Sequence, residues 1–95
     1  IQYSEKDKNL FGLYKEVRNM REEGMFDENR LSSILDRLET DYPKDWLLPL
    51  EIWELVPESE TSLLHSRIKK TLEELIKDEK TGHLVRDGLR LVSYT

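Results

Sequence analysis

The sequence predicts an all-α fold of about five short amphipathic helices, arranged as a small bundle or a helix-hairpin repeat. Apolar residues recur at three- and four-residue intervals through most of the chain, which is the spacing of one helix face. Apolar and charged residues each make up 37% of the 95 residues, which favours helices with solvated outer faces. A chain of this length has room for one core, so we expect residues 1–95 to form a single helical domain.

Two amphipathic helices are predicted in the first part of the chain. The first should end at Gly24, since glycine is typical of helix C-termini. Its stripe consists of Leu10, Leu13, Tyr14, Val17 and Met20. Gly12 lies inside this helix, which predicts either a closely packed neighbour or an exposed face. Asp27 can cap the second helix, which Pro43 should stop. Its stripe consists of Leu31, Ile34, Leu35, Leu38 and Tyr42.

The segment YPKDWLLPLEIWEL, residues 42–55, predicts a third helix that is apolar nearly all round. We expect it to run from Trp46 to Val56, capped by Asp45 and ended by Pro57. Pro49 falls near the first turn, where a missing backbone N–H is tolerated. A helix of this composition is normally buried on most sides, which predicts a central position in the core.

One side of this third helix is also a candidate interface. Trp46 and Trp53 are seven residues apart, so they share a side, which also holds Leu50. Tryptophan is enriched at the residues that dominate binding between proteins. Covering every side of such a helix is difficult for a core this small. We therefore predict that the side with Trp46, Leu50 and Trp53 meets a partner or another domain.

A fourth helix should open at Ser59 or Thr61 and close at Gly82. Its inward stripe consists of Leu64, Ile68, Leu72, Leu75 and Ile76. Residues 83–94 allow two interpretations. The pair Asp87-Gly88 between apolar runs is typical of a β-hairpin. A helix would instead make Gly88 a costly interior residue. Such a helix would place on one side Leu84, Val85, Leu89 and Val92.

A shift of about 37 residues brings the apolar positions of the chain into coincidence, which is in the range of helix-hairpin repeats. The coinciding pairs are Leu31 with Ile68, Leu35 with Leu72, Leu38 with Leu75, Leu47 with Leu84, Leu48 with Val85, Ile52 with Leu89, and Leu55 with Val92. This register favours a helix at the C-terminal end. Any two amphipathic helix pairs can be aligned in this way, so a true repeat and a simple bundle both stay open.

The sequence predicts no catalytic, metal-binding or cofactor-binding residues. There is no cysteine, and His65 and His83 are eighteen residues apart without a metal-binding spacing. No serine stands in a G-x-S-x-G context. Paired acids such as Glu73-Glu74 point in different directions on a helix and fit a solvated face better than acid–base chemistry.

Charge and hydropathy also exclude two classes of partner. The net charge is −5, and the basic residues are dispersed among acids, so we expect no nucleic-acid binding. No apolar run approaches the length of a membrane span, and no signal peptide is visible, so we expect no membrane partner and a cytoplasmic location. The sequence starts at Ile1 rather than methionine, and we expect a domain excised from a larger protein.

Three segments together resemble a known family. They are LFGLYKEVRNMRE at 10–22, YPKDWLLPLEIWEL at 42–55 and HLVRDGLRLV at 83–92. In this order they resemble the C-terminal extension that follows the catalytic domain in some bacterial pterin-dependent aromatic amino acid hydroxylases, of the phenylalanine-4-hydroxylase type. The resemblance covers most of the chain, although most of it outside DWLLPLEI is generic helical sequence.

This resemblance implies a parent enzyme that hydroxylates an aromatic amino acid with molecular oxygen, a tetrahydropterin and non-haem iron. In that family two histidines and a glutamate hold the iron, and no part of this chain matches that motif. The chain would then be a non-catalytic appended domain with a docking, oligomerisation or regulatory role. Its partner would be the parent catalytic domain or a second subunit. The alternative is a free-standing helical-repeat module that binds a peptide or protein.

Overall fold

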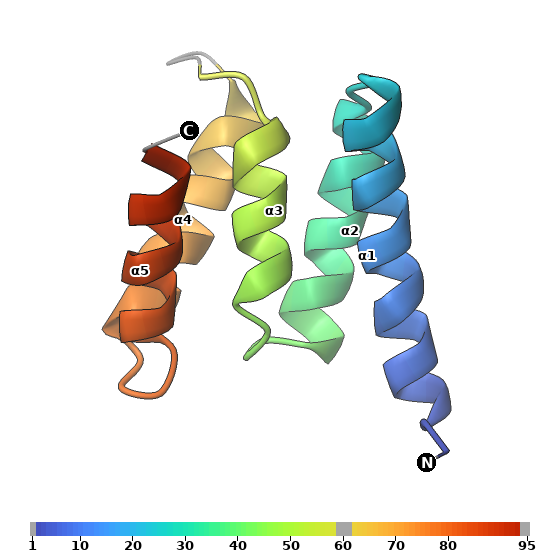
Figure 1. Cartoon of the computed structure of the whole chain (residues 1–95), viewed down its shortest axis with the longest axis horizontal. Coiled ribbons are helices and arrows are strands. Elements are labelled where there is room, and N and C mark those ends of the chain that lie inside the picture. The colour runs from blue at the N-terminus through green and yellow to red at the C-terminus, as the bar shows by residue number, and fades with distance from the viewer. Residues whose placement is uncertain (1, 59–61, 94–95) are drawn as a thin grey trace.

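The computed structural model describes residues 2–58 and 62–93, except for the side chains of Val92 and Ser93, and these residues form five helices and no strand. The helices are α1 (Glu5–Glu23), α2 (Glu28–Asp41), α3 (Leu47–Leu55), α4 (Leu63–Lys77) and α5 (Gly82–Ser93) (Figure 1). The all-α prediction is confirmed, and the C-terminal segment is a helix rather than a β-hairpin. None of the described helices combines the length and apolarity needed to cross a membrane.

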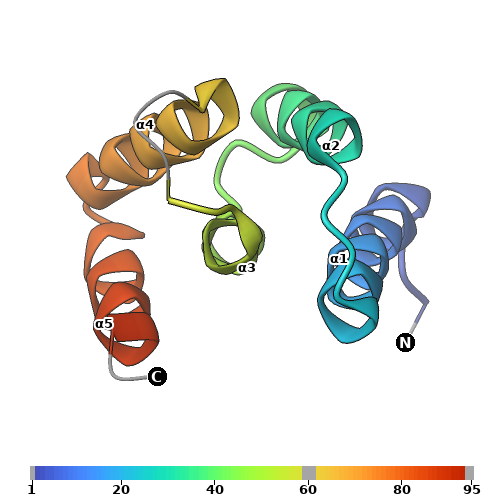
Figure 2. The same cartoon turned by 90° about the horizontal axis from the view of Figure 1, so that it is seen from above.

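The helices form two layers. Consecutive helices run in opposite directions (Figure 1). Figure 2 shows α2 and α4 in one layer and α1, α3 and α5 in the other. Helix α3 packs against α1, α4 and α5, and α2 packs against α4. The four outer helices form an arch around α3 that is open on one side (Figure 2).

All five helices contribute to one core, and α3 lies at its centre, as its composition predicted. The predicted stripes of the first, second and fourth helices face inward. The buried apolar residues are Leu13, Val17, Leu31, Ile34, Leu35, Leu38, Leu48, Leu50, Ile52, Val56, Leu64, Ile68, Leu72, Leu75 and Val85. Burial of this apolar surface is the main force that holds the short helices together.

Polar side chains and one glycine fix the helix ends. Asp27 accepts a hydrogen bond from the backbone N–H of Arg30 at 3.0 Å, which confirms it as the N-cap of α2. The third helix is one residue shorter at each end than the predicted Trp46 to Val56, and Trp46 rather than Asp45 is its N-cap residue. Asp45, the preceding residue, accepts a hydrogen bond from the N–H of Leu48 at 3.2 Å. Gly24 follows α1 with φ 66°, a left-handed conformation that favours glycine.

The ends predicted for the fourth helix need correction. The side chain of Ser62 caps α4 by accepting from the N–H of His65 at 3.1 Å. The predicted openings, Ser59 and Thr61, lie outside the described residues. Gly82 does not close α4, which ends at Lys77; it is the first residue of α5. A tight turn separates the two helices, and a Cβ atom on Gly82 would collide with the Ile76 carbonyl. Glycine is therefore required here by the close approach of the backbone in the turn, and not as the C-cap of α4.

The two glycines inside helices have different surroundings. A Cβ atom on Gly88 would lie 2.5 Å from Cδ1 of Leu50. Gly88 therefore allows α5 to approach α3 closely, which explains a residue that is otherwise unfavourable in a helix. A Cβ atom on Gly12 would meet nothing within 4 Å. Of the two predictions made for Gly12, the exposed face is the one observed.

The 37-residue shift relates α2 to α4 and α3 to α5, and it keeps each helix in its own layer (Figure 2). Leu31 and Ile68 are both buried, as are Leu48 and Val85. The last predicted pair includes Val92, whose side chain lies outside the described residues. Alternation of two layers is the arrangement of helix-hairpin repeats, and it is equally compatible with an up-and-down bundle.

Candidate functional site

The open side of the arch is the candidate functional site. We call it the concave face and define it as the side formed by α1, α3 and α5, which none of the described helices covers (Figure 2). A groove of about 720 Å³ lies between α1 and α3, and a second of about 400 Å³ lies between α3 and α5. Leu47 lines both grooves, so they meet at the start of α3.

The α3–α5 groove is mainly apolar. Its apolar lining residues are Trp46, Leu47, Leu50, Leu84 and Leu91. Leu91 is 70% exposed and Leu47 is 39% exposed. Exposed leucines gathered along a groove are typical of interaction surfaces, whereas single exposed apolar residues are ordinary. The charged lining residues are all acids: Glu51, Glu54 and Asp87.

The structure brings together two of the three residues predicted to form an interface. Trp46 is partly buried and lines the α3–α5 groove. Leu50 lines the same groove but is only 4% exposed, because it packs on Gly88. Trp53 stacks on His65 of α4, with ring centroids 4.8 Å apart. That these three residues meet a partner stays a prediction.

The exposed leucines were not among the residues predicted from the sequence. The periodicity of Leu47 and Leu91 fits core positions as well as surface positions. Only the absence of a covering helix over the described part of α3 makes Leu47 accessible. The 37-residue register did align Leu47 with Leu84, and both residues line this groove.

A polar cluster joins α1 to the start of α3. The hydroxyl of Tyr14 donates to both carboxylate oxygens of Asp45, at 2.8 and 2.9 Å. Burial raises the pKa of Asp45, and the negative charge of Glu51 adds to this, although hydrogen bonds from Tyr14 and Leu48 oppose it. Burial also raises the pKa of the Tyr14 phenol, so it remains a neutral donor. The cluster fixes one wall of the concave face.

Glu51 lies deeper in the concave face. Its Oε1 atom accepts from Nε of Arg18 at 3.1 Å and is 3.8 Å from Arg21. Arg21 also pairs with Glu54 at 3.3 Å. The Glu51 side chain is only 12% exposed. Its Oε2 atom is buried and has no hydrogen-bond partner in the described part of the chain, which is unusual for a buried carboxylate oxygen.

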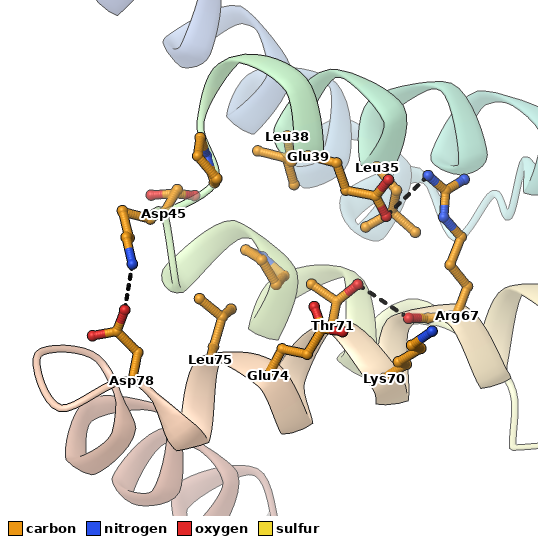
Figure 3. A pocket seen from close by; sticks show the side chains of 13 residues that line it. Leu35, Leu38, Glu39, Asp45, Arg67, Lys70, Thr71, Glu74, Leu75 and Asp78 are labelled. Atoms are coloured by element: carbon orange, nitrogen blue, oxygen red, sulfur yellow. Dashed lines mark hydrogen bonds and ion pairs between the residues drawn. The ribbon is translucent and has the colours of Figure 1, made fainter.

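A third groove, of about 650 Å³, lies between α2 and α4 (Figure 3), and Asp45 lines both this groove and the α1–α3 groove. We call it the outer groove. Leu35, Leu38 and Leu75 contribute its apolar lining. Arg67 extends from α4 toward α2, where it pairs with Asp36 at 2.6 Å and Glu39 at 3.2 Å.

Further polar contacts cross the outer groove or its end. Arg67 also donates to the carbonyl of Ser32 at 3.2 Å. Burial lowers the pKa of Arg67, but hydrogen bonds from its guanidinium to Asp36 and Glu39 outweigh this and raise it. Lys44 pairs with Asp78 at one end of the groove (Figure 3). These charges satisfy one another, so the outer groove is primarily a joint between helices.

The described residues contain no group of three or more histidine, aspartate or glutamate side chains placed to hold a metal ion. His65 is stacked on Trp53, and His83 is exposed on α5. No family model, curated protein or solved structure matches the chain.

Proposed function

We propose that this chain is a non-catalytic docking domain of an aromatic amino acid hydroxylase of the phenylalanine-4-hydroxylase type. Its concave face contacts the parent catalytic domain or a second subunit. Iron and tetrahydropterin bind in the parent catalytic domain, and this chain contributes no ligand to either. The family assignment is supported by the three sequence segments described above, and the docking role by the concave face.

The observation that carries the docking role is the exposed apolar lining of the α3–α5 groove. Leu47 of α3 and Leu91 of α5 are both accessible there, beside the partly buried ring of Trp46. Covering these side chains would remove apolar surface from water, which favours association by roughly 25 cal/mol per Å² before the costs of binding. The outer groove offers no comparable gain, because its leucines Leu35, Leu38 and Leu75 are buried.

A free-standing helical-repeat module is the second candidate, and one observation favours it. The helices alternate between two layers, and the 37-residue shift maps α2 onto α4 and α3 onto α5. Repeat proteins of this kind commonly bind partners on a concave surface. Both candidates use the same face, so they differ in whether this chain is covalently part of a hydroxylase.

The docking role is tested by Leu91→Asp in the full-length natural protein. Leu91 is highly exposed, so the substitution should leave the fold intact while placing a charge on the docking surface. We expect a change in the mass or shape of the assembly, measured by light scattering and small-angle X-ray scattering. Leu63→Asp is the matched control, because Leu63 is 84% exposed and lines neither groove of the concave face. Identical behaviour of both variants and wild type would contradict the docking role.

The family assignment needs a separate test. The natural protein can be isolated with an antibody against this domain and assayed for iron content and pterin-dependent hydroxylation of phenylalanine. We expect a mass several times the 11.4 kDa of this chain, together with hydroxylase activity. A natural protein of about that mass without such activity would instead favour the free-standing module.

A further inference from the structure

We propose that the partner element bound by the concave face is a basic amphipathic helix. Its apolar stripe enters the α3–α5 groove, and its lysine or arginine side chains meet Glu51, Glu54 and Asp87. This inference rests on the proposed function, since it specifies the chemistry of the partner for the same face. It specifies that the partner element is positively charged and helical, which the docking role alone does not require.

The apolar part of the groove fits a helix. Leu84, Gly88 and Leu91 are spaced four and three residues apart along α5, so they form one ridge beside α3. The described chain has no strand edge on which an extended peptide could add a strand. Parallel helical ridges with an apolar groove between them accept the apolar face of another helix. The groove of about 400 Å³ has Trp46 and Leu47 at one end.

The charges of this groove have one sign. Its three ionisable lining residues are Glu51, Glu54 and Asp87, and all are acids. The arginines that pair with Glu51 and Glu54 come from α1, on the other side of α3. Among the residues that the structure describes, Asp87 forms one ion pair, with Arg90 at 3.8 Å, and both side chains are more than two-thirds exposed. A pair so open to solvent contributes little, so Asp87 remains available to a basic partner.

Glu51 gives an independent reason to expect a donor. Its Oε1 atom accepts from Arg18, while its Oε2 atom is buried and has no partner among the described residues. A buried carboxylate oxygen without a donor is unfavourable. Because Glu51 lines the groove, a lysine or arginine bound there would bring a donor to this carboxylate. An acidic helix would add like charges instead.

The test uses two synthetic peptides of about 18 residues with the same leucine stripe on a helical period. One carries lysines beside the stripe and the other carries glutamates, and neither contains tryptophan. Binding to the 95-residue chain is followed by the fluorescence of its own tryptophans and by calorimetry. We expect the lysine peptide to bind at least about 10-fold more tightly, because like charges in the second peptide oppose docking. The difference should shrink near 1 M salt, where the Debye length is ~3 Å.

Matched variants assign the effect to the groove. Asp87→Lys should weaken binding of the lysine peptide about 10-fold, because a like charge replaces an opposite one. Glu73→Lys makes the same change in charge at an exposed position on α4, outside both grooves of the concave face, and should leave binding within about twofold. Equal binding of the two peptides, no binding of the lysine peptide, or equal effects of the two variants would overturn the inference.

The outcomes separate this inference from the proposed function. If Leu91→Asp disrupts assembly of the full-length protein but the two peptides bind equally, the docking face stands and the basic partner does not. If the lysine peptide is preferred while Leu91→Asp has no effect on the full-length protein, the groove has the chemistry inferred here and the docking role is wrong.

Discussion

The outer groove and the α3–α5 groove are both hollows between neighbouring helices, yet their polar groups are organised differently. In the outer groove, Arg67 of α4 pairs with Asp36 and Glu39 of α2. Within the residues that the structure describes, no ion pair joins α3 to α5, and the acids of that groove share it with exposed leucines. A hollow whose charges are paired across it holds helices together. A hollow with exposed apolar side chains and no ion pair across it has surface left to offer a partner.

The contact beneath the α3–α5 groove gives the largest expected effect. Gly88→Leu places a side chain where even a Cβ atom would lie 2.5 Å from Leu50. Because a leucine side chain at this position would have to displace the buried Leu50, we expect a loss of about 1–3 kcal/mol in the free energy of unfolding. Urea denaturation measures this as a lower midpoint with an unchanged slope.

Gly12→Leu is the matched control for that substitution. A Cβ atom at Gly12 meets nothing within 4 Å, so the same change should stabilise α1 by about 0.5–1 kcal/mol through helix propensity. Opposite signs at the two glycines would confirm that α5 depends on a close approach to α3. Equal stabilisation at both positions would mean that Leu50 moves away from residue 88 at little cost in free energy.

A smaller change in the free energy of unfolding is expected from substitutions that compare the outer groove with the α3–α5 groove. Arg67→Met removes the guanidinium that links α4 to α2 while keeping much of the side-chain volume. We expect a destabilisation of about 1 kcal/mol, because the pairs are partly exposed and the Ser32 carbonyl loses a donor. Leu91→Gln, on the exposed rim of the other groove, should change the free energy of unfolding by less than about 0.5 kcal/mol. A larger loss from Leu91→Gln than from Arg67→Met would contradict the assignment of the two grooves.

The smallest effects concern pH. Burial raises the pKa of Asp45 above its ordinary value of 3.8. A raised carboxyl pKa favours the protonated folded state, so its contribution to stability is present below about pH 4 and is lost as pH rises through the folded-state pKa. The hydrogen bond from Lys44 lowers the pKa of Asp78. Its contribution is present above about pH 4 and is lost as pH falls through its folded-state pKa.

Carboxyl carbon NMR measures both titrations in one experiment. We expect Asp45 to titrate above the ordinary aspartate value and Asp78 below it. Tyr14→Phe should raise the pKa of Asp45 further, because it removes a hydrogen bond that favours the carboxylate. It should leave the pKa of Asp78 unchanged, since that pKa is lowered by Lys44 and by the backbone N–H groups of Lys80 and Thr81. Coincident titration of Asp45 and Asp78 would contradict the different surroundings assigned to them.

Local sequence was sufficient to predict the helices and most of the core. The stripe of α2 and the cap at Asp27 depend on residues within one or two turns, so spacing and capping chemistry predict them. The prediction that Gly82 closes the fourth helix was wrong, because a glycine between two helices can end the first or begin the second. Gly82 begins α5 because a tight turn follows Asp78, and the geometry of that turn depends on how α5 packs on α4.

The sequence by itself determined five amphipathic helices, an apolar third helix at the centre, and a surface of mixed charge, because these follow from periodicity and composition. Tertiary structure alone decided which sides of α3 are covered. It buried Leu50 against Gly88, stacked Trp53 on His65, and left Leu47 and Leu91 accessible. The physical reason is that exposure depends on neighbours distant in sequence, and residues of the same apolar type occupy both the core and the open groove.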